Sequence, residues 1–327
     1  MSKVLITRKI PGSALEKLKQ SHDVTMWDFD RVMTPQEIME LGRDADAIIC
    51  LLYDRWTPEM MDEFPNLKII SNYAVGFDNI DLEAATQKGI VVTNTPSDEV
   101  NESVAEFTWA LLLSISRRMV EAGEFAKKGL YRGWEPEIFL GHDVRGKTLG
   151  IIGLGRIGGM VAKRAQGFGM KVLYYEREQH PDREKELGVE YKALDELLGA
   201  SDYVTIHVPY TPETKHLINE EKFKKVKRGA FLINTARGGI IDEHALVKAL
   251  QDGQLAGAAL DVHEREPQMN PELMQMENVI LTPHVASASV EVREKMTEQA
   301  VDAVIKTLNG EQPETIVNKE VWEKKRK

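Results

Sequence analysis

The chain has almost no cysteine, no membrane-length apolar run and no excess of basic charge. Its single cysteine, Cys50, excludes a disulfide framework, and the lack of Cys/His clusters or an HExxH sequence predicts no metal site. The opening MSKVLITRKI lacks the apolar block of a signal peptide, so a cytoplasmic location is expected. The net charge of −10 predicts no nucleic-acid or membrane-surface partner.

What the 327 residues do contain is an alternation of short β-rich runs with helical patterns. In the first part, strands are expected at Val4–Thr7, Ala47–Leu52, Lys68–Asn72 and Ile90–Thr93, with helices at Ser13–Lys19, Pro35–Leu41 and Asp81–Lys88. In the second part, strands are expected at Leu149–Ile152, Lys171–Tyr175, Tyr203–Val208, Ala230–Asn234, Gly257–Asp261 and Val279–Thr282. This rhythm predicts an α/β fold with two doubly wound parallel sheets, each covered by helices on both faces.

Two domains are expected from the length and from this rhythm. One long helix over Ser103–Lys128 and a loop rich in Gly, Trp and Pro over Gly129–Gly146 precede the second βα series, and a last helix, Val290–Asn309, is expected to return to the first domain. The predicted substrate domain is residues 1–99 with 287–327, and the predicted dinucleotide-binding domain is residues 100–286. The basic end, Glu323–Lys327, is expected to be a solvated tail.

The clearest motif is LGIIGLGRIG, where an apolar run leads into G-x-G-x-x-G at Gly153, Gly155 and Gly158. Glycine allows a sharp turn and a close approach to a pyrophosphate, whose charge suits the N–H groups at the start of the following helix. The whole turn, including Leu154, Arg156 and Ile157, is therefore expected to bind a dinucleotide.

The next strand ends at Glu176, where the dinucleotide pattern places a carboxylate for the ribose hydroxyls. A carboxylate there repels a 2′-phosphate and favours NAD. The neighbouring Arg177 could accept that phosphate, which leaves NADP open.

Three further strand ends are followed by side chains that can bind an anion or transfer a proton. Arg237 lies in NTARGG, Glu266 in DVHEREP and His284 in TPHVAS. The guanidinium of arginine can hold a carboxylate through two parallel hydrogen bonds, and imidazole exchanges protons near neutral pH. Because parallel strands end at one edge of a sheet, these side chains are expected to meet there. His207, inside YVTIHVP, is interpreted as a packed or cofactor-lining histidine rather than an acid.

These motifs, together with NYAVGFDNID at Asn72–Asp81, stand in the order found in D-isomer-specific 2-hydroxyacid dehydrogenases, and the chain resembles that family over nearly its whole length. It is most similar to the family's glyoxylate/hydroxypyruvate reductases and 2-ketogluconate reductases. The resemblance implies a Rossmann domain, a flavodoxin-like substrate domain, and a homodimer built largely from Ser103–Lys128 and the loop after it. It also implies that Arg237, Glu266 and His284 are the catalytic residues.

Further binding residues follow from the resemblance. The residues expected at the nicotinamide dinucleotide are Val208, Pro209, Thr214, Thr235, Ala236, Asp261 and Ala286, together with Arg237 and His284. The residues expected at the substrate are Ala74, Val75 and Gly76, again with Arg237 and His284. Tyr53 follows a strand end in the first domain and is expected to contact the distal part of the substrate.

The sequence therefore predicts an NAD(P)H-dependent reductase that converts a small 2-oxo acid to the D-2-hydroxy acid. Arg237 would bind the carboxylate and polarise the carbonyl, His284 would supply the proton, and Glu266 would orient and favour the imidazolium. One alternative is a reductase of 2-ketogluconate or another bulkier acid. An alternative of another class is an NAD(H)-sensing protein that resembles the corepressors related to this family.

Overall fold

The computed structural model describes residues 1–326; Lys327, the last residue of the basic end, lies outside the described residues. The chain forms two compact units. The first contains Met1–Val100 and the segment from Ala288 onward, and the second contains Asn101–Ser287.

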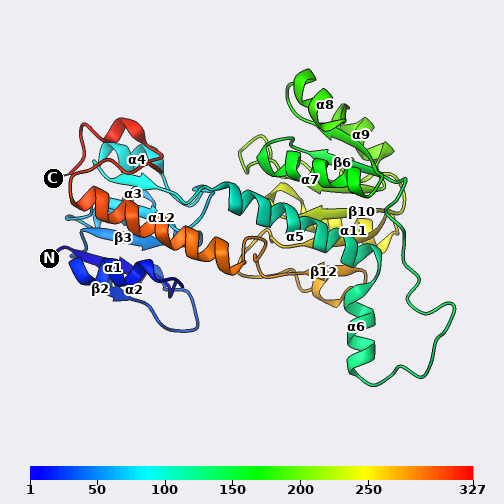
Figure 1. Cartoon of the computed structure of the whole chain (residues 1–327), viewed down its shortest axis with the longest axis horizontal. Helices are drawn as coiled ribbons and strands as arrows, with labels where there is room; N and C mark the ends of the chain where they lie inside the picture. The colour runs from blue at the N-terminus through cyan, green and yellow to red at the C-terminus, as the bar shows by residue number, and fades with distance from the viewer. Residues whose placement is uncertain (327) are drawn as a thin grey trace. The chain divides into compact units, whose positions relative to one another are not determined.

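The first unit is built on a five-stranded parallel sheet in the order β2-β1-β3-β4-β5 (Figure 1). Its strands are β1 (Lys3–Ile6), β2 (Asp23–Met26), β3 (Ala47–Cys50), β4 (Ile69–Asn72) and β5 (Val91–Thr93). Its helices are α1 (Ala14–Ser21), α2 (Pro35–Gly42), α3 (Pro58–Asp62), α4 (Leu82–Gln87) and α12 (Val290–Leu308). The sequence prediction contained no strand at β2, because this edge strand alternates exposed and half-buried residues instead of forming an apolar run.

Local sequence explains where these helices begin. The Thr34 side chain accepts a hydrogen bond from the Glu37 amide while the Glu37 carboxylate accepts one from the Thr34 amide, which is a capping box at the start of α2. Asp81 caps α4 in the same way as an acceptor for the Ala84 amide. The long α12 returns to this sheet, where the Ser71 hydroxyl of β4 donates to the Ala300 carbonyl at 3.2 Å.

The second unit is built on a seven-stranded parallel sheet in the order β12-β11-β10-β9-β6-β7-β8. Its strands are β6 (Thr148–Ile152), β7 (Lys171–Tyr175), β8 (Glu190–Tyr191), β9 (Tyr203–Ile206), β10 (Ala230–Asn234), β11 (Leu255–Leu260) and β12 (Val279–Leu281). Its helices are α5 (Asp98–Ser116), which begins in the first unit, α6 (Met119–Lys127), α7 (Arg156–Gly167), α8 (Pro181–Leu187), α9 (Leu194–Ala200), α10 (Glu220–Phe223) and α11 (Glu243–Gln251). Six of these strands were expected, and the two-residue β8 is the addition.

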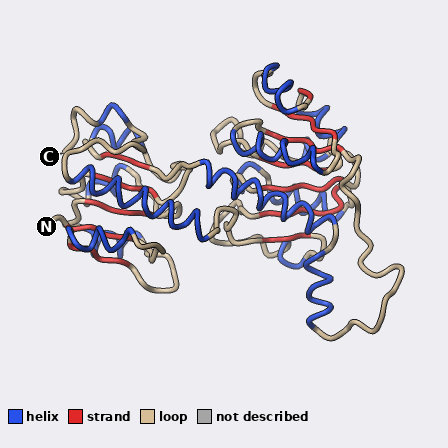
Figure 2. The backbone as a smooth tube through the Cα atoms, viewed as in Figure 1, coloured by secondary structure: helices blue, strands red, loops and turns tan. Residues whose placement is uncertain are grey.

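The single helix expected over Ser103–Lys128 is wrong. The chain breaks between α5 and α6 at Arg118, whose φ of 51° lies in the left-handed region. Its guanidinium pairs with Glu121 one turn into the new helix. Figure 2 shows α6 and the long loop after it extending away from the sheet of their unit, and no residue of α6 is buried.

The basic end also differs from the solvated tail that was expected. The Arg326 guanidinium donates to the carbonyls of Phe64 at 2.7 Å, Leu67 at 3.2 Å and Lys88 at 2.8 Å. The Arg326 amide donates to the Gly89 carbonyl at 2.9 Å. This arginine therefore satisfies carbonyls at the ends of two segments of the first unit that would otherwise need water or other donors.

Candidate active site

The dinucleotide turn begins where β6 ends, and α7 starts directly after it at Arg156. Gly153 has a φ of 96°, a conformation that favours glycine. A Cβ added at Gly158 would lie 2.0 Å from the Gly153 carbonyl oxygen, whereas one added at Gly155 would meet no protein atom within 4 Å. The first and last glycines therefore close the turn, and Gly155 faces open space in front of the helix start, as a bound pyrophosphate requires.

Arg183 on α8 supports this turn. This role of Arg183 was not predicted from the sequence. Its guanidinium donates to the Leu154 carbonyl and, at 3.4 Å, to the Gly155 carbonyl. A Cβ at Gly159 would lie 2.5 Å from the same guanidinium, so a larger residue there would displace the arginine from the turn. No local pattern marks such an arginine, because its partners are backbone carbonyls nearly thirty residues away.

Glu176 follows β7 as predicted, and Arg177 is next to it. The Oε2 atom of Glu176 is 3.2 Å from Nε2 of His180, an ion-pair distance. Yet within residues 1–326 this buried oxygen makes no hydrogen bond. A carboxylate oxygen with spare acceptor capacity at this strand end fits a ribose hydroxyl.

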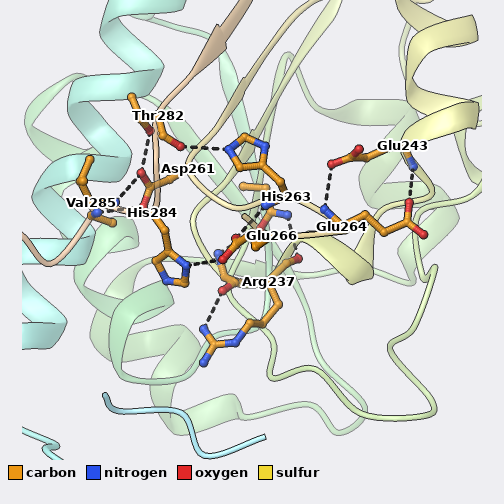
Figure 3. Close-up of polar contacts among 12 residues, drawn as sticks. Arg237, Glu243, Asp261, His263, Glu264, Glu266, Thr282, His284 and Val285 are labelled. Carbon is orange, nitrogen blue, oxygen red and sulfur yellow. Dashed lines mark hydrogen bonds and ion pairs between the residues drawn. The ribbon is translucent and has the colours of Figure 1, made fainter. Parts of the chain in front are cut away.

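His284 and Glu266 form a direct pair at the edge where β11 and β12 end (Figure 3). Nδ1 of His284 is 2.9 Å from Oε2 of Glu266, and both side chains are largely buried. The other carboxylate oxygen, Oε1, accepts from the His263 amide at 2.8 Å. The carboxylate is thereby fixed on both sides, and it fixes the imidazole with Nε2 directed elsewhere.

Asp261 holds the turn that carries His284. Its fully buried carboxylate accepts from the amides of Val285 and Ala286, both at 2.8 Å, and from the Thr282 hydroxyl at 2.6 Å. His284 itself has a φ of 55°, an uncommon conformation for a non-glycine residue. The surrounding hydrogen bonds determine this conformation, as they do at strained functional residues in general.

Arg237 leaves the end of the neighbouring strand, β10. Its Nη1 atom donates to the Ala236 carbonyl at 2.9 Å, and its own carbonyl accepts from the Asn234 side chain at 2.9 Å. A Cβ at Gly238 would lie only 1.9 Å from the His263 carbonyl carbon. The loop of Arg237 is thus packed directly against the segment that leads to Glu266.

The remaining predicted cofactor residues lie at the same strand ends. Thr214 closes its own loop, with its hydroxyl donating to the Pro209 carbonyl at 2.7 Å. The Thr235 hydroxyl is 2.9 Å from that of Thr108 on α5. The Ala286 carbonyl accepts a hydrogen bond from the Ser103 hydroxyl, and the Ala286 amide donates one to Asp261. Both backbone polar groups of Ala286 are therefore bonded within the protein. Val208 is half-buried and packs on the core of the unit.

His207 stands at the end of β9 with a buried Nε2. Burial lowers the pKa of His207 to about 3, because an apolar environment disfavours the charged imidazolium. This ring stays neutral at physiological pH, which agrees with its interpretation as a packed or cofactor-lining histidine rather than an acid.

Besides Arg237 and His284, the predicted substrate residues belong to the first unit. Ala74 is buried, and Val75 and Gly76 are half-buried in the loop after β4. Tyr53 is half-buried in the loop after β3. Each of these loops follows the carboxyl end of a parallel strand, where α/β proteins bind ligands.

Over residues 1–326, no three His, Cys, Asp or Glu side chains gather as metal ligands. Across the same part of the chain, no helix is both long enough and apolar enough to span a membrane.

Comparisons with known proteins agree with this geometry. Residues 109–286 match the model for the NAD-binding domain of D-isomer specific 2-hydroxyacid dehydrogenases. A glyoxylate reductase of Thermococcus kodakarensis is 48% identical over 323 residues, which cover 98% of this chain and 97% of that protein.

Two solved structures extend the comparison. The NADPH-dependent glyoxylate/hydroxypyruvate reductase of Sinorhizobium meliloti, in complex with NADP and malonate, is 33% identical with a TM-score of 0.86, covering 100% of this chain and 99% of that one. The D-lactate dehydrogenase of Aquifex aeolicus, complexed with NAD and lactic acid, is 34% identical with a TM-score of 0.80, covering 94% and 96% of the two chains.

Proposed function

Since this chain belongs to the D-isomer-specific 2-hydroxyacid dehydrogenase family, we propose that it reduces glyoxylate and hydroxypyruvate. Hydroxypyruvate would give the D-2-hydroxy acid, and glyoxylate would give the achiral 2-hydroxy acid. The membership makes it an NAD(P)-dependent enzyme that reduces small 2-oxo acids. The names of the relatives support the two proposed substrates. The alternative of an NAD(H)-sensing binding protein receives no support from these relatives, which are named as reductases and a dehydrogenase.

The observation that carries the proposal is the His284–Glu266 pair beside the loop of Arg237. In the proposed mechanism, Arg237 binds the substrate carboxylate and polarises the adjacent carbonyl oxygen. His284 donates a proton from Nε2 to that oxygen as negative charge develops on it. Glu266 holds Nδ1 and so fixes the direction in which Nε2 points.

The glycine turn and Glu176 would hold the nicotinamide dinucleotide, which when bound supplies a hydride to the carbonyl carbon. Near the nicotinamide, the contacting residues would be Asp261, Ala236 and Thr235. The residues of the loop after β9 that would contact the dinucleotide are Val208, Pro209 and Thr214. The amides of Val75 and Gly76 would donate hydrogen bonds to the substrate carboxylate. Tyr53 would contact the far side of a substrate longer than glyoxylate.

The proposal is tested by measuring oxidation of NADH and of NADPH, by loss of their absorbance, with a panel of 2-oxo acids. We expect the highest kcat/KM with glyoxylate and hydroxypyruvate. Higher kcat/KM with 2-ketogluconate, pyruvate or an aromatic 2-oxo acid would move the assignment to a different member of the family. Failure of every 2-oxo acid to support turnover would overturn the proposed function.

For the cofactor we propose a preference for NAD, with NADP also accepted. The free acceptor capacity of Glu176 supports this preference, since the carboxylate can bind a ribose hydroxyl but repels a 2′-phosphate. Glu176→Ser is expected to shift the NADPH/NADH ratio of kcat/KM toward NADPH by about tenfold, the loss of one charged contact. A ratio that stays at the wild-type value would refute this role. Lys171→Ser, on the exposed start of the same strand, provides the control.

We also propose a homodimer in the cytoplasm. The surface that supports it consists of α6, none of whose residues is fully buried by residues 1–326, and the loop after it. The apolar side chains exposed on this surface are Met119, Val120, Leu130, Tyr131, Trp134 and Leu140. A group of exposed apolar side chains on one projecting segment is typical of a surface that a partner covers. The one cysteine is buried and free, as suits a reducing compartment.

A further inference from the structure

The loop after β4 has three consecutive carbonyl groups that each accept a hydrogen bond from its own unit. The Ala74 carbonyl accepts from the Thr95 amide at 2.9 Å. The Val75 carbonyl accepts from Nδ2 of Asn94 at 2.8 Å, and the Gly76 carbonyl accepts from Nδ2 of Asn72 at 2.8 Å. Two asparagine side chains and one amide thus determine how three successive peptide planes are turned.

This arrangement also determines where the amide hydrogens of the loop point. In a planar trans peptide the N–H lies opposite the C=O of the preceding residue. The N–H groups of Val75, Gly76 and Phe77 therefore point away from the donors that hold the three carbonyls. Within residues 1–326 these amides donate no hydrogen bond, and the three residues are half-buried or exposed. Successive amides turned to one side form a site for an anion.

Asn72 is itself held in place. Asn72 is fully buried and exchanges side-chain hydrogen bonds with Asn79 at 3.2 and 3.3 Å. Asn79 in turn donates to the carbonyls of Leu51 and Asp54 at 3.2 and 3.1 Å. The Asn72 side chain is therefore already fixed in the absence of substrate, so little ordering of this part of the loop is needed on binding.

We propose that Asn72 and Asn94 are positioning residues for the substrate carboxylate. Asn94 and Asn72 hold the carbonyls of Val75 and Gly76 and so present the amides of Gly76 and Phe77 to the anion, without touching it themselves. The Val75 amide beside them is oriented by the Thr95 amide, which holds the Ala74 carbonyl. The Phe77 amide is a third donor in addition to the two that the resemblance implies. This inference rests on the proposed function, in which the loop binds a 2-oxo acid.

The test uses Asn94→Asp, which keeps the shape of the side chain but replaces the donor with a carboxylate oxygen facing the Val75 carbonyl. We expect KM for glyoxylate to rise about 10- to 100-fold, because a lost donor leaves a carbonyl unpaired and lets the peptide plane turn. The kcat at saturating substrate is expected to change much less. The affinity for NADH, measured by fluorescence, is expected to stay at the wild-type value. Binding of oxamate, a carboxylate that is not reduced, in the presence of NADH should weaken in parallel with KM.

Asn219→Asp is the matched control. Asn219 caps α10 as an acceptor for the Lys222 amide, a role that aspartate fulfils equally well. Asn94→Ala removes the donor without adding charge, so it gives the same comparison if the aspartate variant does not fold. An unchanged KM and unchanged oxamate binding in a folded Asn94 variant would overturn the inference, as would an equal loss of NADH affinity. A wild-type enzyme that reduces no 2-oxo acid would instead overturn the proposed function.

Discussion

Replacing His284 with alanine is expected to lower kcat for glyoxylate about 100- to 10,000-fold, the usual contribution of a positioned general acid. The physical reason is the geometry of the pair: Nδ1 is bound to Glu266 at 2.9 Å, which leaves Nε2 as the only ring atom that can deliver the proton. The glycine turn and Glu176 are unchanged in this variant. NADH affinity, followed by fluorescence titration, should therefore remain close to that of the wild type.

His244→Ala is the matched control, because His244 is an exposed residue of α11. Glu266→Gln keeps the shape of the side chain but replaces one carboxylate oxygen with an amide nitrogen, so it should lose part of the same rate by loosening the orientation of the imidazole. Near-wild-type turnover of His284→Ala with both glyoxylate and hydroxypyruvate would remove His284 from the role of acid.

Arg237→Lys is expected to reduce kcat/KM about 10- to 100-fold, the usual effect of losing one hydrogen bond to a charged group. The charge is conserved in this variant, but an ammonium group cannot form the two parallel hydrogen bonds that a guanidinium offers a carboxylate. The loss should appear chiefly in KM for the 2-oxo acid. Steady-state kinetics with glyoxylate at saturating NADH measures it.

The control for this variant is Arg117→Lys, at an arginine that is 61% exposed. Circular dichroism and the melting temperature establish that the Arg237 variant is folded. If its KM and kcat both equal those of the wild type, Arg237 does not bind the carboxylate.

Much of the fold could be predicted because its strands are buried on both faces. Parallel strands such as β6 and β10 appear in the sequence as continuous apolar runs. The prediction failed where that signal is absent: β2 is an edge strand with alternating exposure, and β8 has only two residues. The break at Arg118 could not be seen either, because any local propensity for helix continues through it and only the backbone conformation ends α5.

The candidate site also contains residues that could be predicted from the sequence and residues that could not. Motifs marked Arg237, Glu266 and His284, because each follows an apolar strand. The side chains that orient the site were missed, since Arg183, Asn72 and Asn94 act on backbone carbonyls rather than on one another. A hydrogen bond to a carbonyl leaves no pattern of residue types in the sequence, so only coordinates reveal it.

The tight backbone contact between Gly238 and His263 has a consequence for protein engineering. With 1.9 Å between an added Cβ and the facing backbone, any side chain at this position pushes two reactive loops apart at once. Mutant libraries aimed at new substrates should therefore leave position 238 unvaried and diversify Tyr53 and Phe77 instead. Both positions lie in the first unit, in the loops that are proposed to bind the substrate.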